Sequence, residues 1–467
     1  MMSDPASAVG GFSLHPTLPI TIFATSLGFV VVQLDGSILN VALVQIGISL
    51  GTSVDGLQWT VDAYFLAFAV LLLSAGVLSD RLGARRAFVS GFAVFSAASL
   101  ACALALSPAA LIGARVLQGG GAALLVPCSL ALLNNACGSD SPARARAIGI
   151  WTAAGAVATT AGPVLGGLLV GFIGWRSIFL VNLPIGVIGI WLTLRFVDRP
   201  ERSQLRHGPD LAGQTLAILA LLGLVGAIIE AGSLGWRAAL PLSGVVLAVL
   251  AGTGFIIVEA KTEAPAVPLE LFRHPAFSAA TIVGFSVNLT VYGSTFAFAL
   301  YFQRVLLFSP VETGLAFLPF ALTMTVANLI GGRMAARVGL RLPIIGGLLV
   351  GAAGCALLSD IDRQTTYAAM LPGQLLIRIG IGLVVPPMTT AVLSSVHRTR
   401  SGIASGLLNA VRQTGGAVGV ALFGALMATD MVRGVQIALV GCAGLIVIAT
   451  TIAIAGIRSE STSPAYR

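Results

Sequence analysis

The chain has 467 residues, of which 57% are hydrophobic and only 9% are charged. Soluble domains carry about 25% charged residues, and disordered chains combine low hydrophobicity with high net charge. The composition therefore excludes both classes. The mean hydropathy of +0.97 requires most of the chain to face lipid or other apolar segments.

Fourteen apolar stretches separate the charged residues, and each is close to the ~20 residues needed to cross the hydrocarbon core of a membrane. They fall at residues 17–42, 58–79, 87–106, 109–135, 147–170, 177–195, 211–230, 238–258, 277–303, 312–332, 342–359, 366–391, 402–428 and 434–457. The connectors between them are short. We therefore expect an all-α polytopic membrane protein with 14 transmembrane helices and no folded soluble domain.

The net charge of +8 reflects 26 basic residues, which occur in twos to fours between the apolar stretches. A nucleic-acid interface needs clustered Lys and Arg, so we expect no nucleic-acid partner. Eighteen of the 26 fall in loops on the side of the N-terminus and five in the opposite loops. Because cytoplasmic loops collect basic residues, this bias predicts a multi-pass protein of the cell inner (plasma) membrane with both termini in the cytoplasm.

The first two stretches each contain a carboxylate, Asp35 and Asp62. A charge inside an apolar span is costly, and such residues usually face a water-filled cavity. Asp35 is therefore the strongest candidate for binding and releasing protons, and Asp62 is a second. The alternative for Asp35 is a solvated position at the outer end of the first helix.

The segment that follows the second stretch combines glycines with charges, namely Gly76, Asp80, Arg81, Gly83, Arg85 and Arg86. Glycine permits close packing and a tight turn. Asp80 can face a helix N-terminus or an arginine and so latch the cytoplasmic side of the protein.

The pattern Gly, Arg, Gly, Arg of this segment returns in the same register after 256 residues, at positions 332, 337, 339 and 341. An internal repeat at matching places predicts two parallel halves. We expect six-helix bundles at 17–195 and 277–457, with an inserted two-helix hairpin at 211–258. The alternative is that glycine and arginine are simply common at the ends of membrane helices.

Three arginines lie inside apolar stretches, Arg115 in the fourth and Arg378 and Arg412 in the twelfth and thirteenth. A buried arginine keeps its charge and needs an acceptor. Arg115 could instead extend to the nearer interface, and we interpret Arg378 and Arg412 mainly as structural.

In the fifth stretch, Pro163 bends the helix and its neighbouring glycines permit close packing; these glycines are Gly162, Gly166 and Gly167.

Taken in order, these motifs resemble those of the major facilitator superfamily, and within it the fourteen-span drug:proton antiporter branch. Residues 76–86 resemble its motif A. Arg115-x-x-Gln118-Gly119-x-Gly121 resembles motif B, and 162–167 resembles motif C, the antiporter signature. Segments 34–43 and 175–186 are similar to the patterns of that branch in helix one and at the start of helix six.

The resemblance implies a major facilitator fold and a proton-coupled antiporter that exports amphipathic organic compounds or drugs from the cytoplasm. It places Arg115 near helix one, so that Arg115 and Asp35 would couple protons to transport. Asp62 is a further candidate, for a proton or a substrate role. Motif A would gate the cytoplasmic side, although Ala84 departs from its basic pattern and predicts a weaker latch. In motif C, Ala158 replaces an expected glycine.

Patterns for catalysis or cofactor binding are missing from the sequence. The five cysteines have no CxxC spacing, the four histidines have no paired spacing, and Lys261 lacks the glycine cradle of an ATP-binding loop. We expect no enzymatic activity, cofactor or metal, and a monomer whose partners are protons, a small-molecule substrate and the lipid bilayer. Two alternatives stay open: a dedicated exporter of one endogenous metabolite, and a transport-inactive membrane sensor.

Overall fold

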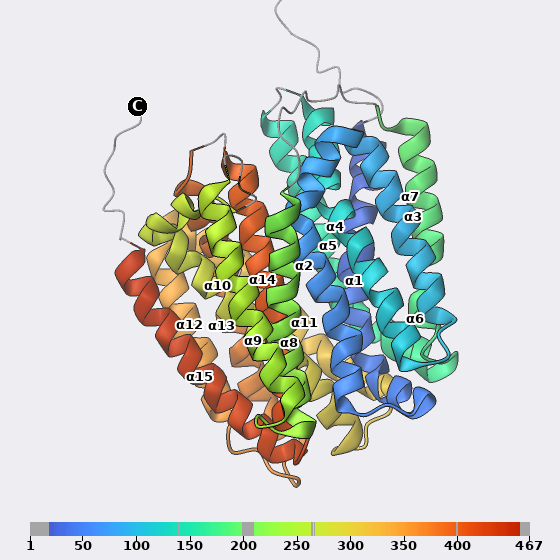
Figure 1. Ribbon diagram of the computed structural model, residues 1–467, viewed down its shortest axis with the longest axis vertical. Coiled ribbons are helices and arrows are strands. Elements are labelled where there is room, and N and C mark those ends of the chain that lie inside the picture. Colours follow the sequence, from blue (N-terminus) through green and yellow to red (C-terminus); the bar gives the residue numbers. More distant parts are fainter. Residues whose placement is uncertain are drawn as a thin grey trace, which may run out of the picture.

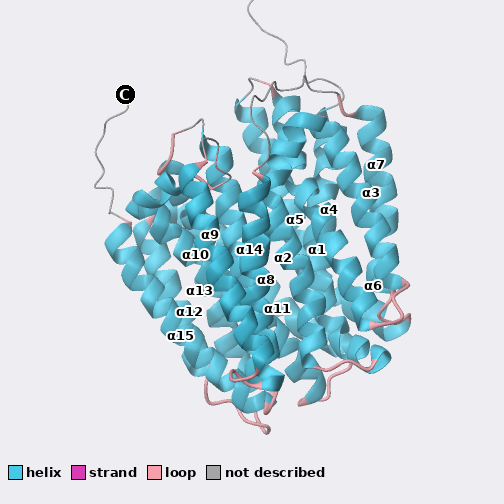
Figure 2. Cartoon of the chain, in the orientation of Figure 1, coloured by secondary structure: helices cyan, strands magenta, loops and turns pink. Residues whose placement is uncertain are grey.

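The computed structural model describes residues 18–138, 141–198, 210–262, 265, 267–397 and 400–457. All regular elements in these ranges are helices, as Figure 2 shows. The all-α class predicted from the sequence is therefore confirmed.

The first part of the chain forms seven helices that pack mainly on one another. They are α1 (Leu18–Leu50), α2 (Val54–Leu82), α3 (Ala84–Ala103), α4 (Pro108–Cys137), α5 (Ser141–Phe172), α6 (Ser177–Leu180) and α7 (Asn182–Phe196). The short α6 leads directly into α7, and together they occupy the single stretch expected at 177–195.

The last part of the chain forms a second group of helices, preceded by the 3-10 helix η1 (Leu269–Arg273). They are α10 (Pro275–Arg304), α11 (Pro310–Val338), α12 (Arg341–Leu357), α13 (Tyr367–Ser394), α14 (Ser401–Met427) and α15 (Met431–Gly456). The two groups meet where α5 packs on α11, α2 on α14 and α1 on α10. Helix α1 begins and α15 ends at the same end of the molecule (Figure 1).

Between the two groups in sequence lie α8 (Leu211–Leu234) and α9 (Ala239–Lys261), which pack on each other. Their contact is close, because a Cβ atom built on Gly223 would lie 2.6 Å from the carbonyl oxygen of Gly244. Helix α8 also packs on α2 and α14, across the junction of the two groups. There, Trp59 Nε1 donates to Glu230 Oε1 at 3.2 Å, so Glu230 takes part in the contact between α2 and α8.

The 256-residue repeat has the same local geometry in both copies. Gly83, between α2 and α3, has φ +85°, and Gly339, between α11 and α12, has φ +82°. These angles favour glycine. Arg85 Nε donates to Thr193 O near the end of α7 at 3.1 Å, and Arg341 Nη2 donates to Ile454 O near the end of α15 at 3.0 Å. Each arginine thus donates to a carbonyl group near the C-terminus of a helix, where basic side chains commonly bind.

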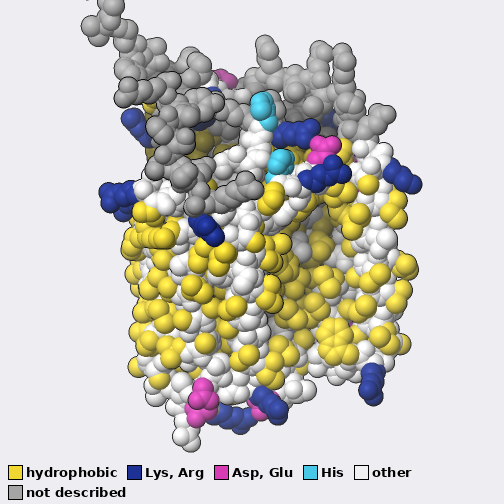
Figure 3. Space-filling view, turned by 90° about the vertical axis from the view of Figure 1, so that its left-hand side faces the viewer, with side chains coloured by type: hydrophobic (Ala, Val, Ile, Leu, Met, Phe, Trp, Pro, Cys, Tyr) yellow, Lys and Arg dark blue, Asp and Glu magenta, His cyan; other side chains and the backbone are white. Residues whose placement is uncertain are grey.

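The surface carries an apolar belt between two charged rims (Figure 3). Among the described helices, twelve are long and apolar enough to cross a membrane. Two further helices are not among these twelve: α2, which has 29 residues, and α12, which has 17 residues. The structure confirms a multi-pass helical membrane protein, and the count of fourteen spans stays a prediction.

Candidate functional site

A cavity of about 270 Å³ lies at the junction of the two helix groups. Helices α1, α2 and α5 form one wall, and α10, α11, α13 and α14 form the other. The lining is mainly apolar and aromatic, with a small set of amide, hydroxyl and guanidinium groups. Such a mixture is typical of sites for small organic ligands.

Beside this cavity, α1 and α4 contribute a buried ion pair. Arg115 Nη1 lies 2.5 Å from Asp35 Oδ2, and each side chain is only 1% exposed. The contact inferred between these two residues is present in the structure. Neither residue occupies a solvated end of its helix, so the interfacial alternatives for both are wrong.

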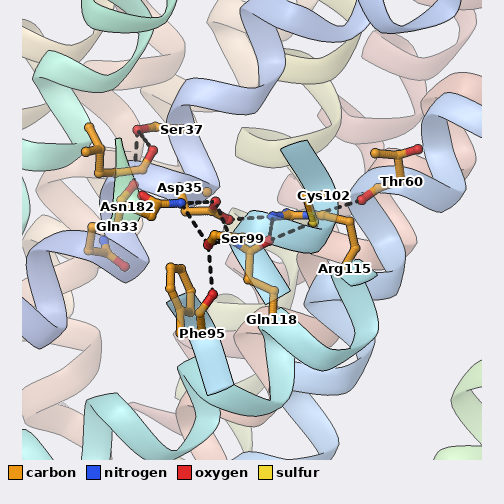
Figure 4. Close-up of polar contacts among 12 residues, drawn as sticks. Gln33, Asp35, Ser37, Thr60, Phe95, Ser99, Cys102, Arg115, Gln118 and Asn182 are labelled. Atoms are coloured by element: carbon orange, nitrogen blue, oxygen red, sulfur yellow. Dashed lines mark hydrogen bonds and ion pairs between the residues drawn. The ribbon is translucent and has the colours of Figure 1, made fainter. Parts of the chain in front are cut away.

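Two side-chain amides complete the surroundings of Asp35 (Figure 4). Gln118 Nε2, from α4, donates to Asp35 Oδ1 at 2.7 Å, and Asn182 Nδ2, at the start of α7, donates to the same oxygen at 3.0 Å. Both amides also donate to Ser99 Oγ of α3, at 2.8 and 3.3 Å. Because all three partners of the carboxylate are donors, this arrangement fits an ionised, acceptor-only Asp35.

Arg115 makes further contacts that connect the ion pair to the cavity wall. Its Nε donates to Thr60 O of α2 at 3.1 Å, and its Nη1 donates to Gln118 Oε1 at 2.6 Å. Its guanidinium carbon lies 4.3 Å from the ring centroid of Tyr64, a cation–π contact. Tyr64 lines the cavity, whereas Asp35 and Arg115 do not. The expectation that the pair lies in a water-filled pocket is therefore wrong, since both side chains are buried and neither lines the cavity.

Asp62 lies in α2, is fully buried, and is not part of this network. Among the described residues, neither of its carboxylate oxygens has a hydrogen-bond partner. One helical turn away, Gln58 Nε2 donates to Ala421 O of α14 at 2.7 Å. Since residues four apart lie on the same face of a helix, Asp62 belongs to the face of α2 that meets α14. An unsatisfied buried carboxylate is costly, which makes Asp62 a residue that calls for a functional explanation.

Motif C lies where α5 crosses α1 and α11. A Cβ atom on Gly162 would lie 1.9 Å from Ser37 Oγ, and one on Gly166 would lie 2.9 Å from Ile38 O. On the other side, a Cβ atom on Gly167 would lie 2.6 Å from Pro310 O, and one on Gly314 would lie 2.4 Å from Pro163 O. The glycines therefore permit backbone contact between the two helix groups, at the end of the molecule opposite the chain termini (Figure 1).

Motif A occupies the end of α2 and the start of α3. Gly83 makes the turn that the sequence predicts, and Arg81 and Arg86 are exposed. Gly76 has no atom within 4 Å of a built Cβ, so the close packing expected there is wrong. The side chain of Asp80 lies outside the described residues, and the latch proposed for it stays a prediction.

Sequence reasoning missed three residues of the ion-pair network: Ser99, Gln118 and Asn182. Gln118 and Asn182 were part of the motifs quoted for the fourth and sixth spans, and an amide buried in an apolar span requires a hydrogen-bond partner. That requirement is the signal that could have identified them. Ser99 carries no such signal, because a serine hydroxyl in a helix is commonly satisfied by the carbonyl one turn earlier, and Ser99 Oγ does donate to Phe95 O at 2.8 Å.

Two groups of apolar helices around a polar and aromatic cavity, with buried charges beside it, define a membrane transporter with a small-molecule site between its halves. The family model of the Major Facilitator Superfamily matches residues 25–420. The chain belongs to this superfamily, and it is accordingly a transporter and not an enzyme.

The relatives of the chain include named resistance proteins. It is 38% identical over 408 residues to the methylenomycin A resistance protein of Streptomyces coelicolor, covering 87% of this chain and 85% of that protein. It is 38% identical over 415 residues to the multidrug resistance protein Stp of Mycobacterium tuberculosis, covering 89% and 77%. The fold is similar to that of a bacterial homolog of the human lysosomal transporter Spinster, with a TM-score of 0.67, 17% identity, and coverage of 95% of this chain and 97% of that one.

Proposed function

We propose that this protein is a proton-coupled antiporter that exports amphipathic organic compounds or drugs from the cytoplasm. The resistance functions named for its relatives support export. The observation that carries proton coupling is the surroundings of Asp35, where three donors and no acceptor contact the carboxylate.

Protonation of Asp35 is incompatible with this set of contacts. A neutral carboxyl group carries a hydrogen that needs an acceptor, so one of the donors must leave or rotate. Asp35 belongs to α1, whereas its partners come from α4 and α7. Binding a proton therefore favours a different packing of these helices and also frees Arg115, which contacts Tyr64 at the cavity wall. In this way protonation and the shape of the substrate cavity become linked.

Contacts between the two helix groups support closure on the side opposite the termini. The inter-group contacts at Gly167 and Gly314, and the bond from Gln303 Nε2 to Val41 O at 3.1 Å, lie between the cavity and that end of the molecule. We propose that these contacts form the external gate and that motif A gates the cytoplasmic side. Alternating access would then separate α5 from α11 while motif A closes.

The same proposal includes the finer architecture. Counting α2 and α12 as spans and α6 with α7 as one gives fourteen transmembrane helices, with six-helix bundles on either side of the α8–α9 hairpin. The bias of basic residues supports cytoplasmic termini, and the same proposal takes the protein as a monomer. The hairpin packs on the outside of the junction, since the residues that line the cavity come from α1, α2, α5, α10, α11, α13 and α14.

The test is transport in everted membrane vesicles with an imposed pH gradient. Proton movement, followed with a pH-sensitive dye, should occur when an exported compound is added to wild-type vesicles. Asp35→Asn should abolish this coupling, whereas Asp360→Asn, the same change at an exposed residue, should preserve it. Normal pH-driven transport by Asp35→Asn would refute the role of Asp35 and direct attention to Asp62. A response to one compound only would favour a dedicated exporter, and none in any panel would favour a sensor.

A further inference from the structure

The wall of the cavity formed by the second helix group contains two arginines, Arg378 of α13 and Arg412 of α14. Arg378 is 5% exposed, its Nη2 donates to Thr295 Oγ1 at 2.8 Å, and its buried Nε has no partner. Arg412 Nε donates to Asn288 Oδ1 at 3.3 Å. Both guanidinium groups therefore line the cavity, and both donate hydrogen bonds to neutral side chains of α10.

No carboxylate compensates these charges within the described part of the chain. The ion pairs found there involve Arg115, Arg363 and Arg400. The residues that line the cavity include no Asp or Glu, and the buried Asp62 forms no ion pair with either arginine. A guanidinium group has five N–H donors, and a buried charge without a partner is strongly unfavourable. The two arginines that line the cavity therefore lack a negatively charged partner among the described residues.

The two halves of the chain differ at this point. In the first half, Arg115 of the fourth helix contacts a carboxylate of the first helix, Asp35. In the second half, the fourth helix is α13 and the first is α10, and the corresponding contact joins Arg378 to the hydroxyl of Thr295. The first half supplies its own anion, and the second half leaves an arginine whose anionic partner is missing.

The rest of the cavity is suited to an apolar ring system. The ring centroids of Phe65 and Tyr292, from opposite walls, lie 4.7 Å apart in an edge-to-face arrangement. Phe317 and Phe320 form a second such pair at 5.7 Å, and all four residues line the cavity. Aromatic faces and edges of this kind bind planar organic groups.

From these observations we propose that the substrates are amphipathic organic anions, which carry a carboxylate or a similar acidic group on an apolar, ring-containing body. Arg378 and Arg412 bind the anionic group, and the aromatic side chains bind the body. This proposal rests on the proposed export function and specifies its substrate class. It distinguishes the protein from an exporter of organic cations, for which two uncompensated arginines would be repulsive.

The test uses three probes with the same ring system and different charge: 2-naphthoate, 2-naphthamide and 2-naphthylmethylammonium. Binding to the purified full-length protein is measured at one pH without a gradient. We expect 2-naphthoate to bind with a Kd roughly tenfold or more below that of either other probe, since hydrogen bonds to charged groups are worth at least that factor. Arg378→Gln should raise the Kd of 2-naphthoate by about tenfold and that of 2-naphthamide by less than about twofold.

Two control variants separate local charge from folding and from overall charge. Arg378→Lys keeps a positive charge and should retain most of the preference for the anion. Arg433→Gln removes a charge from an exposed position at the start of α15 and should leave all three Kd values unchanged. The same set with Arg412→Gln tests the second arginine.

Equal or tighter binding of the cationic probe, or no binding of 2-naphthoate, would overturn the proposal. An equal loss of affinity for the anion and the amide in Arg378→Gln would also overturn it, because that result indicates a purely structural arginine. These outcomes are distinct from failure of the export proposal. A protein that binds 2-naphthoate but moves no protons would refute only the antiport, whereas pH-driven export of the cation would refute only the substrate class.

Discussion

Removing the charge of Asp35 should destabilise the protein more than its loss of a single hydrogen bond suggests. In Asp35→Asn, the amide must face Arg115 on one side and two amide donors, from Gln118 and Asn182, on the other. In either orientation of the new side chain, its NH₂ group meets at least one donor. Arg115 also loses its only ion-pair partner in the described structure.

The magnitude follows from the burial of the pair. Breaking a buried ion pair by removing one partner costs about 3–5 kcal/mol, and both residues are 1% exposed. Arg115 retains the carbonyl of Thr60, the amide oxygen of Gln118 and the ring of Tyr64. These contacts place the expected cost near the lower limit, at about 3 kcal/mol. In Asp35→Asn/Arg115→Gln the buried charge is gone, so the double variant should recover about 2 kcal/mol of the loss.

The assay is unfolding of the purified protein in one detergent at one pH, with the wild type, both single variants and the double variant forming a double-mutant cycle. Asp360→Asn provides the control at an exposed position and should lie within about 0.5 kcal/mol of the wild type. The reasoning is wrong if the double variant loses the sum of the two single losses. It is equally wrong if Asp35→Asn is as stable as the wild type.

Three further predictions concern the external gate, the contact between α12 and α15, and the topology. Gly314→Val places a side chain where a Cβ atom would lie 2.4 Å from Pro163 O, so we expect it to open the external gate, and cysteine labelling from outside should detect this. Gly346→Ala is the control, because a Cβ atom there meets open space, and it should leave the gate closed. Arg341→Gln removes a hydrogen bond to the end of α15 and should lower the unfolding free energy by about 1–2 kcal/mol, and a change below about 0.3 kcal/mol would show that this bond contributes nothing. Arg86→Cys, in a chain without its native cysteines, should resist an impermeant thiol reagent in intact cells, and ready labelling would reverse the proposed orientation.

The sequence by itself determined the class of the protein and most of its helices. Apolar stretches of ~20 residues can only span a membrane as helices, because lipid offers no hydrogen-bond partners to the backbone. The turn glycines were equally readable, since the positive φ of Gly83 and Gly339 is a local property that glycine adopts without strain. The family resemblance placed Arg115 near helix one, and the cost of burying either charge alone favoured its contact with Asp35.

Only the tertiary structure decided which groups share an environment, because that depends on the rotation and crossing of helices far apart in the chain. The sequence placed Asp35 in a water-filled pocket, but the structure leaves Asp35 1% exposed and outside the cavity lining, to which Tyr64 belongs. Arg378 and Arg412 read as structural residues in isolated spans. The fold brings both to one wall, where the partner of Arg378 from α10 is a hydroxyl and not a carboxylate. Hydropathy measures the cost of burying a charge, and only the packing of the helices determines whether a partner compensates it.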